Sequence, residues 1–399
     1  MYYGVVMDIP GNLDVWVLAG QSNMEGVGRL DNALEPDDRV FNFTSAGNWE
    51  VAAEPLHRFW ESFTPVHQNL MRQWLTDEQK DLSDEELARI ADETRVTGTG
   101  VGISFGKAMA DALGKPIGLI AAAHGGTSLE QWSPALKDQG GLSLYGAMLE
   151  RIKRAGGNVK GVLWYQGESD ATPEIAATYA QRFDEWIASV RADLNQPELP
   201  VIVVQIGRIA VCKNEEPGSW PDARSWEVVR DALRTLPERT PYTAVTTAID
   251  LGLEDCIHVA TDGLIRLGKR MAKLALHLSG HSEIPTGPKV ERIEIAESDR
   301  SMGVLRVVCS GLQGGWKTAQ HMAGFELRSA DNTIHPTNLV MDARADSENP
   351  SAIRVLLAVL PENGDMLAYG PGLDPYCNVV DEADMALCAF TSIGLSPLG

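Results

Sequence analysis

Residues 15–28 read VWVLAGQSNMEGVG, and this stretch decides the fold. Its first five residues form a short, continuous apolar run, as expected of a strand that is buried on both faces of a parallel sheet. Gly20 then provides a turn, and Ser22 follows just beyond the carboxyl end of the strand. Because open α/β sheets bind ligands at that edge, we expect Ser22 to present its hydroxyl there as a nucleophile. The simpler alternative is a helix-capping serine.

Four further apolar runs of the same kind follow along the chain, at residues 117–122, 161–165, 201–206 and 242–248. Apolar residues at helical spacing lie between them, so the pattern predicts an α/β domain with a five-stranded parallel sheet. After about residue 282 a linker rich in Pro and Gly leads into short β-like runs without a long helix. We therefore expect an α/β domain at 1–282 and a small all-β sandwich domain at 289–399.

One acidic segment, at about residues 60–98, interrupts the alternation of strands and helices. Within it, Ser83 and Glu86 have the spacing of a capping box, which predicts the start of a helix. The plainer interpretation is a solvated helical insertion. The alternative is a lid over a site at the nearby sheet edge.

Two of the other apolar runs are also followed by residues that could take part in catalysis. Gly125 and Gly126 follow the second run, and paired glycines let backbone N–H groups approach a ligand as an oxyanion hole requires. Gln166 follows the third run and offers a carboxamide N–H to the same oxyanion. Glu168 lies two residues further on, where a carboxylate acts as a base or, more simply, orients its neighbours.

The last run is followed by Asp255 and His258, which are three residues apart and so share one face of a turn. The Asp255 carboxylate can then accept from His258 Nδ1–H and leave Nε2 free to take a proton from a serine. The chain order of Ser22, Asp255 and His258 is one that hydrolases use. We predict these three as catalytic residues, with the N–H groups of Ser22 and Gly125 or Gly126 and the Gln166 amide as the oxyanion hole.

The composition narrows the range of partners. The 399 residues include 34 Lys and Arg against 55 Asp and Glu, a net charge of −21. Such an acidic protein is not expected to bind nucleic acid or an anionic membrane, because its surface would repel their phosphate groups. No apolar run reaches ~18 residues, so no membrane-spanning helix is predicted. Neither the His nor the Cys residues show metal-ligand spacing, so we expect no metal or cofactor. A Cys377–Cys388 disulfide and the oligomeric state stay open.

The start of the sequence, MYYGVVMDIPGNLD, shows no signal peptide. The sequence therefore leaves two localisations open, a cytoplasmic protein or a secreted protein that has lost its leader.

Together these motifs resemble the signature blocks of the SGNH hydrolase superfamily, and most of all its branch of sialate O-acetylesterases and family 6-like carbohydrate acetylesterases. The matching stretches are GQSNM at 20–24, GGT at 125–127, WYQGESD at 164–170 and DCIH at 255–258. Residues 369–390 are similar to the C-terminal stretch of sialate O-acetylesterases. The resemblance implies a three-layer α/β/α, flavodoxin-like domain, with Gln166 in place of the asparagine of the general pattern.

The residues and the resemblance predict a serine esterase that removes O-acetyl groups from a carbohydrate through an acyl-enzyme, most closely a sialate O-acetylesterase. The alternatives are an acetylesterase for xylan or another polysaccharide, and a non-catalytic carbohydrate-binding protein. A sialate carboxylate would favour an arginine at the pocket mouth. The candidates are Arg29, Arg208 and Arg266. Residues predicted to bind or orient the substrate are Gln21, Asn23, Glu168 and Trp132.

Overall fold

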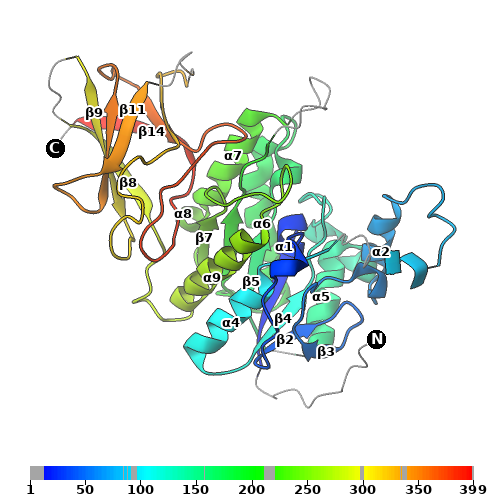
Figure 1. The fold of residues 1–399 in the computed structure, drawn as a ribbon. Helices are drawn as coiled ribbons and strands as arrows, with labels where there is room; N and C mark the ends of the chain where they lie inside the picture. Colours follow the sequence, from blue (N-terminus) through cyan, green and yellow to red (C-terminus); the bar gives the residue numbers. More distant parts are fainter. Residues whose placement is uncertain are drawn as a thin grey trace.

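The computed structural model describes residues 13–83, 85–87, 89–90, 97–156, 158–210, 221–296, 301–332, 334 and 339–397. These residues form a mixed α/β structure with two seven-stranded sheets (Figure 1). The first sheet has the strand order β3-β2-β4-β1-β5-β6-β7, and the second has the order β10-β13-β14-β8-β9-β12-β11.

The first sheet is longer than the predicted one. Its strands are β1 (Asp14–Gly20), β2 (Val40–Phe43), β3 (Trp49–Val51), β4 (Ile117–Ala121), β5 (Asn158–Tyr165), β6 (Val201–Gln205) and β7 (Thr243–Thr247). All five predicted strands are present and pair in parallel. The expected count of five was wrong, because β2 adds a parallel strand and β3 an antiparallel one at the edge. Strands of three or four residues are too short to show a periodic pattern.

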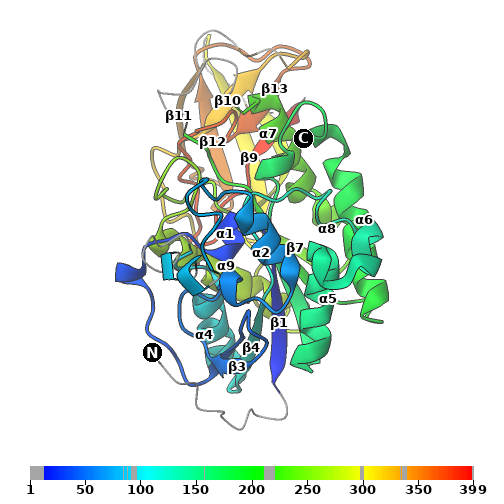
Figure 2. The ribbon, with the colours of Figure 1, turned by 90° about the vertical axis from the view of Figure 1, so that its right-hand side faces the viewer.

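Helices cover both faces of this sheet. Figure 2 shows α4 (Gly102–Leu113) and α9 (Thr261–Leu278) on one side and α5 (Leu144–Ala155) and α6 (Tyr179–Asp193) on the other. Because both faces are covered, the strands β1, β4 and β6 are buried along their whole length, as their continuous apolar runs predicted.

Four further helices have bounds within the described residues, and α7 among them packs against β6 and α6. They are α1 (Ser22–Glu25), α2 (Pro65–Arg72), α7 (Ala223–Arg234) and α8 (Leu236–Arg239). Helix α6 begins only at Tyr179, after turns and a short 3-10 helix, η5 (Ala176–Thr178). In the described part of the chain, no helix is both long and apolar enough to cross a bilayer.

The second sheet holds the C-terminal strands. They are β8 (Lys289–Ala296), β9 (Gly303–Ser310), β10 (Phe325–Arg328), β11 (Val340–Ala345), β12 (Ala352–Leu357), β13 (Met366–Tyr369) and β14 (Phe390–Pro397). Strand β14 pairs with β13 in its first half and with β8 in its second, which joins two groups of strands into one sheet. The expected pair of stacked sheets is thus a single sheet whose end strands β10 and β11 approach each other around one core.

The second sheet packs beside α7 and α8, on the side of the molecule away from α2 (Figure 1). Arg230 of α7 donates to the carbonyl oxygens of Gly370 and Gly372. The open question of a disulfide is answered here, since Cys377 and Cys388 are both free thiols.

Candidate active site

The turn after β1 depends on a glycine. Gly20 has a φ of 128°, and a Cβ at this position would lie 2.2 Å from the carbonyl oxygen of Tyr165. Only glycine lets β1 approach β5 this closely, and Gln21 N–H then donates to the same carbonyl at 2.9 Å. The chain turns at once into α1, which places Ser22 at the carboxyl edge of the sheet.

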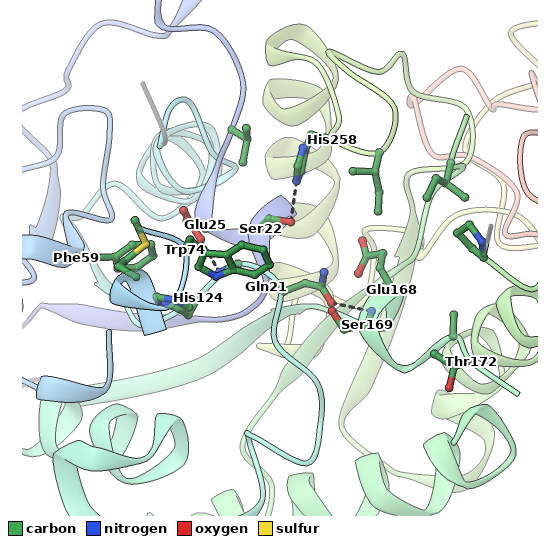
Figure 3. Close-up of a pocket in the computed structure, with 18 of the residues that line it drawn as sticks. Gln21, Ser22, Glu25, Phe59, Trp74, His124, Glu168, Ser169, Thr172 and His258 are labelled. Atoms are coloured by element: carbon green, nitrogen blue, oxygen red, sulfur yellow. Dashed lines mark hydrogen bonds between the residues drawn. The ribbon is translucent and has the colours of Figure 1, made fainter. Parts of the chain in front are cut away.

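Three side chains predicted to act together form one hydrogen-bonded chain. His258 Nε2 lies 2.9 Å from Ser22 Oγ (Figure 3). His258 Nδ1 lies 2.7 Å from Asp255 Oδ2. Because Nδ1 faces a carboxylate, it carries the ring proton, and Nε2 is left to accept from the Ser22 hydroxyl.

The Asp255 carboxylate also shapes the turn that carries His258. Its Oδ1 accepts from the N–H groups of Ile257 and His258, each at 2.8 Å. Burial works to raise the pKa of Asp255, but the hydrogen bonds from His258 and Ile257 outweigh it and hold the pKa below its usual range. Asp255 therefore stays ionised and can stabilise a positive charge on His258.

Asn23 ties the serine helix to the histidine loop. Its Oδ1 accepts from Val259 N–H at 3.0 Å, and its Nδ2 donates to Glu168 Oε1 at 3.1 Å. Burial raises the pKa of Glu168 above its usual range. Gln21 joins the same side of the site, because its Oε1 accepts from Ser169 N–H at 3.3 Å. The predicted orienting residues Gln21, Asn23 and Glu168 thus lie around Ser22 and His258.

A pocket of about 1190 Å³ opens over Ser22 and His258. One wall comes from the acidic segment expected at 60–98 and from Phe59, which directly precedes it. The residues of the segment that line the pocket are Trp60, Met71, Trp74, Leu75, Gln79, Leu87 and Ile90. The predicted capping box forms, since Ser83 N–H donates to Glu86 Oε2 at 2.9 Å. The segment is therefore more than a solvated insertion, and its apolar side bounds the pocket.

Trp74 is the most exposed part of this wall. The residue is 77% exposed although it is a large apolar side chain. It lines the same pocket as Ser22, and a Cβ added at Gly126 would lie 3.8 Å from its ring (Figure 3). Sequence reasoning missed Trp74, because an isolated tryptophan in an acidic segment gives no periodic signal.

Gln166 does not reach the pocket. The side chain is fully buried, and its Nε2 donates to Thr127 O at 3.1 Å and to Asp170 Oδ2 at 2.6 Å. Both of its N–H donors are therefore occupied by protein acceptors. The predicted oxyanion role of Gln166 does not fit this geometry, in which the amide joins the loops after β4 and β5 beneath the site.

Trp132 is a second residue that the structure places elsewhere. It is fully buried, its Nε1 donates to Thr127 Oγ1 at 3.0 Å, and its ring packs edge-on against Trp164 with centroids 5.5 Å apart. Trp132 therefore packs in the core and offers no face to a sugar.

The two predicted oxyanion glycines, Gly125 and Gly126, differ in whether their backbone N–H is already hydrogen-bonded within the protein. Gly125 N–H donates to the carboxyl of Glu25 at 2.6 Å. Within the described residues, the N–H groups of Gly126 and Ser22 donate to no protein atom, so they are the ones available to a ligand. Sequence reasoning missed Glu25, although its position three residues after Ser22 in a helical turn could have revealed it.

The three arginines that sialate recognition would favour are engaged elsewhere. Arg29 pairs with Glu254, Arg208 with Asp374 and Arg266 with Asp384, all at 2.6–2.7 Å. No Lys or Arg is found among the pocket-lining residues that the structure describes. The acidic lining residues are Glu25, Glu168, Glu174 and Asp222.

An open α/β sheet that carries hydrogen-bonded serine, histidine and aspartate side chains at its carboxyl edge defines a class, the α/β hydrolytic enzymes. Residues 12–277 match the model of a particular family, described as carbohydrate esterase, sialic acid-specific acetylesterase. The chain belongs to this family and is a carboxylic ester hydrolase.

Similar proteins support this placement. A probable carbohydrate esterase of Arabidopsis thaliana is 29% identical over 291 residues, which are 67% of this chain and 92% of the relative. The sialate O-acetylesterases of Homo sapiens and Pongo abelii are each 25% identical over 312 residues, and the match spans 71% of this chain but only 57% of theirs.

The crystal structure of a carbohydrate acetylesterase from Xanthomonas citri has a similar fold, with a TM-score of 0.64 and 22% identity. The match covers 94% of this chain and 80% of that one. The shared fold therefore reaches beyond the first sheet into the C-terminal one.

Proposed function

We propose that the protein is a serine esterase that removes acetyl groups from an acetylated carbohydrate, with Ser22 as nucleophile, His258 as general base and Asp255 as the group that orients His258. The observation that carries the proposal is the unbroken chain of hydrogen bonds from Ser22 Oγ through the His258 ring to Asp255. A nucleophile within hydrogen-bond reach of a base that a third group orients is the expected arrangement for acyl transfer.

The reaction follows from this geometry. His258 Nε2 takes the Ser22 proton as Oγ attacks the acetyl carbonyl, and the imidazolium then protonates the departing sugar oxygen. Water, activated by the same nitrogen, attacks the acetyl-serine and releases acetate. We assign the N–H groups of Ser22 and Gly126, which donate to no described protein atom, as the donors to the oxyanion.

Replacement of the nucleophile tests the proposal. We expect Ser22→Ala and His258→Ala to abolish release of acetate from an acetylated sugar, while Ser169→Ala, which removes another pocket-lining hydroxyl, keeps activity near that of the parent. Hydrolysis by Ser22→Ala at the parental rate would refute Ser22 as nucleophile.

Two substrate classes are candidates. The family description and the sialate O-acetylesterase relatives support an acetylated sialic acid. The charge of the pocket favours an uncharged sugar instead, because no described lining residue is Lys or Arg, while Glu174 and Asp222, whose hydrogen bonds hold their pKa values low, stay ionised and would repel a sugar carboxylate. Acetate release from acetylated sialic acid and from acetylated xylan, measured side by side, distinguishes the two.

We also propose that the chain has two domains, with the boundary between residues 282 and 289. Two separate clusters of buried apolar side chains, one around each sheet, support this division. Limited proteolysis should cut between these residues and leave two resistant fragments, whereas cutting first within either sheet would contradict the boundary.

A further inference from the structure

Glu25 is a buried carboxyl group in the pocket to which the proposed mechanism gives no role. It ends α1, three residues after Ser22, and is only 4% exposed. Its Oε2 accepts from Gly125 N–H at 2.6 Å (Figure 3). Within the part of the chain that the structure describes, no protein donor reaches its other oxygen, Oε1.

Gly125 brings this carboxyl next to the nucleophile. A Cβ added at Gly125 would lie 3.0 Å from Glu25 Oε2 and 3.4 Å from Ser22 Cβ, so the carboxyl and the serine flank the same residue. Glu25 also lines the pocket together with Ser22. The carboxyl therefore lies beside the backbone groups where the oxyanion of the reaction would form.

The surroundings of Glu25 favour its neutral form. Burial raises its pKa to about 8, against the opposing effect of the Gly125 hydrogen bond. His57 lies against the Glu25 backbone, and the other titratable side chains in the described pocket lining are His124, Glu168, Glu174, Asp222 and His258. Burial lowers the pKa of both His57 and His124 to about 3, so neither supplies a positive charge at neutral pH.

A neutral acid and a carboxylate would have opposite effects at this position. An ionised Glu25 would place a negative charge beside a developing oxyanion and oppose the reaction. A protonated Glu25 accepts from Gly125 with Oε2 and still has an O–H to donate through Oε1. Carboxylic acids kept neutral by an apolar site are known to act as oxyanion donors.

We propose that Glu25 is a neutral acid within the oxyanion site, where Oε2 holds Gly125 and the acid O–H donates to the acetyl carbonyl oxygen as that oxygen gains charge. The inference rests on the proposed function, because it assumes attack by Ser22. The proton stays on Glu25 throughout, and no bond is made or broken at this residue. Glu25 thus supplies the side-chain donor that Gln166, turned away from the pocket, does not.

The pH profile of kcat/KM for ethyl acetate tests the inference. We expect parental activity to fall as pH rises through about 8, the pKa of Glu25, because ionisation removes the donor and adds a charge. Glu25→Ala should lose about 10²–10³ in turnover at pH 7, as expected for one oxyanion donor. Glu25→Gln, whose amide can donate but does not ionise, should lose less than Glu25→Ala and show no fall near pH 8.

Either of two results would overturn the inference. One is Glu25→Ala activity within about threefold of the parent, and the other is an unchanged alkaline fall in Glu25→Gln. If thermal melting shows that Glu25→Ala does not fold, the profile of Glu25→Gln decides alone. Glu130→Ala, which removes an exposed carboxyl outside the pocket, is the matched control and should behave as the parent.

Labelling with a fluorophosphonate separates this inference from the proposed function. Ser22→Ala should be inactive and unlabelled, and Glu25→Ala should be labelled at Ser22 more slowly than the parent. An active Ser22→Ala would refute the proposed function itself. An inactive Ser22→Ala beside a Glu25→Ala that reacts and is labelled at the parental rate would refute only the role of Glu25.

Discussion

Glu227 on α7 and Arg328 on β10 form a two-point ion pair between a helix that packs on the first sheet and the C-terminal sheet. Arg328 Nη1 lies 3.0 Å from Glu227 Oε2, and Nη2 lies 2.9 Å from Oε1. The Arg328 side chain is only 2% exposed and the Glu227 side chain 10%. This pair is one of the contacts that hold the second sheet against the body that carries the site, together with those of Arg230 to Gly370 and Gly372.

Removing one partner of this pair should destabilise the protein. Arg328→Met leaves the buried Glu227 carboxylate without its counter-ion, which typically costs about 3–5 kcal/mol. Urea unfolding checks this, with Arg344→Met as the control. Arg344 pairs with Asp342 at a site where the arginine is 50% exposed, so its loss should cost less than about 1 kcal/mol. Equal losses in the two variants would show that the buried pair contributes no more than a surface one.

Asp255→Asn should lower kcat while the fold is kept. An asparagine can no longer hold the His258 tautomer that accepts from Ser22, and in a serine protease the equivalent change costs about 10⁴ in kcat. Because the Asp255 side chain is 48% exposed, water can partly replace it, and we expect a loss of about 10²–10³. Steady-state hydrolysis of p-nitrophenyl acetate measures the loss. Asp262→Asn, an exposed change in the first turn of α9, is the control and should have parental kcat.

Trp74→Ala should change the preference for sugar esters over small esters. An exposed ring at the pocket wall can stack on a sugar, and a stacked aromatic contributes about 1 kcal/mol. We expect the ratio of kcat/KM for an acetylated xylo-oligosaccharide to that for ethyl acetate to fall about five- to tenfold. Tyr376→Ala, which removes an equally exposed ring outside the pocket, should leave the ratio unchanged. A parental ratio in Trp74→Ala would exclude a stacking role.

Acid should destabilise the protein through a cluster of buried histidines. Burial lowers the pKa of His57 and His124 to about 3 and that of His67 well below its usual value, and the Arg151 charge adds to the effect on His57 and His67. These groups bind protons more readily when the chain is unfolded, so the stability they contribute is present above pH 6.5 and is lost as pH falls toward 3.

Urea unfolding at pH 7.5 and at pH 5 measures this loss. His57→Gln should reduce the difference in unfolding free energy between the two pH values, because glutamine keeps a hydrogen-bond acceptor for Ala123 N–H but takes up no proton. His321→Gln replaces a 91% exposed histidine and should not change the difference. A pH dependence that is the same in His57→Gln as in the parent would remove His57 from the explanation.

Much of the site could be read from the sequence because it is built from local turns. Ser22, Asp255 and His258 were predicted from their places after apolar runs, and the fold brings these three side chains together. The carboxyl ends of parallel strands meet at one edge, so residues far apart in sequence become neighbours once the strands are identified. Gln166 follows a strand in the same way, yet its amide turns inward to Thr127 and Asp170.

By itself, the sequence determined the alternation of strands and helices and the side of the sheet on which the polar residues gather. Both follow from hydrophobic periodicity and from turn residues such as Gly20, which act over a few positions. Only the tertiary structure decided that β2 and β3 extend the sheet, that Trp74 reaches the pocket, and that Glu25 meets Gly125. These depend on packing between distant segments, and neither the direction of a side chain nor the burial of a carboxyl is encoded in local spacing.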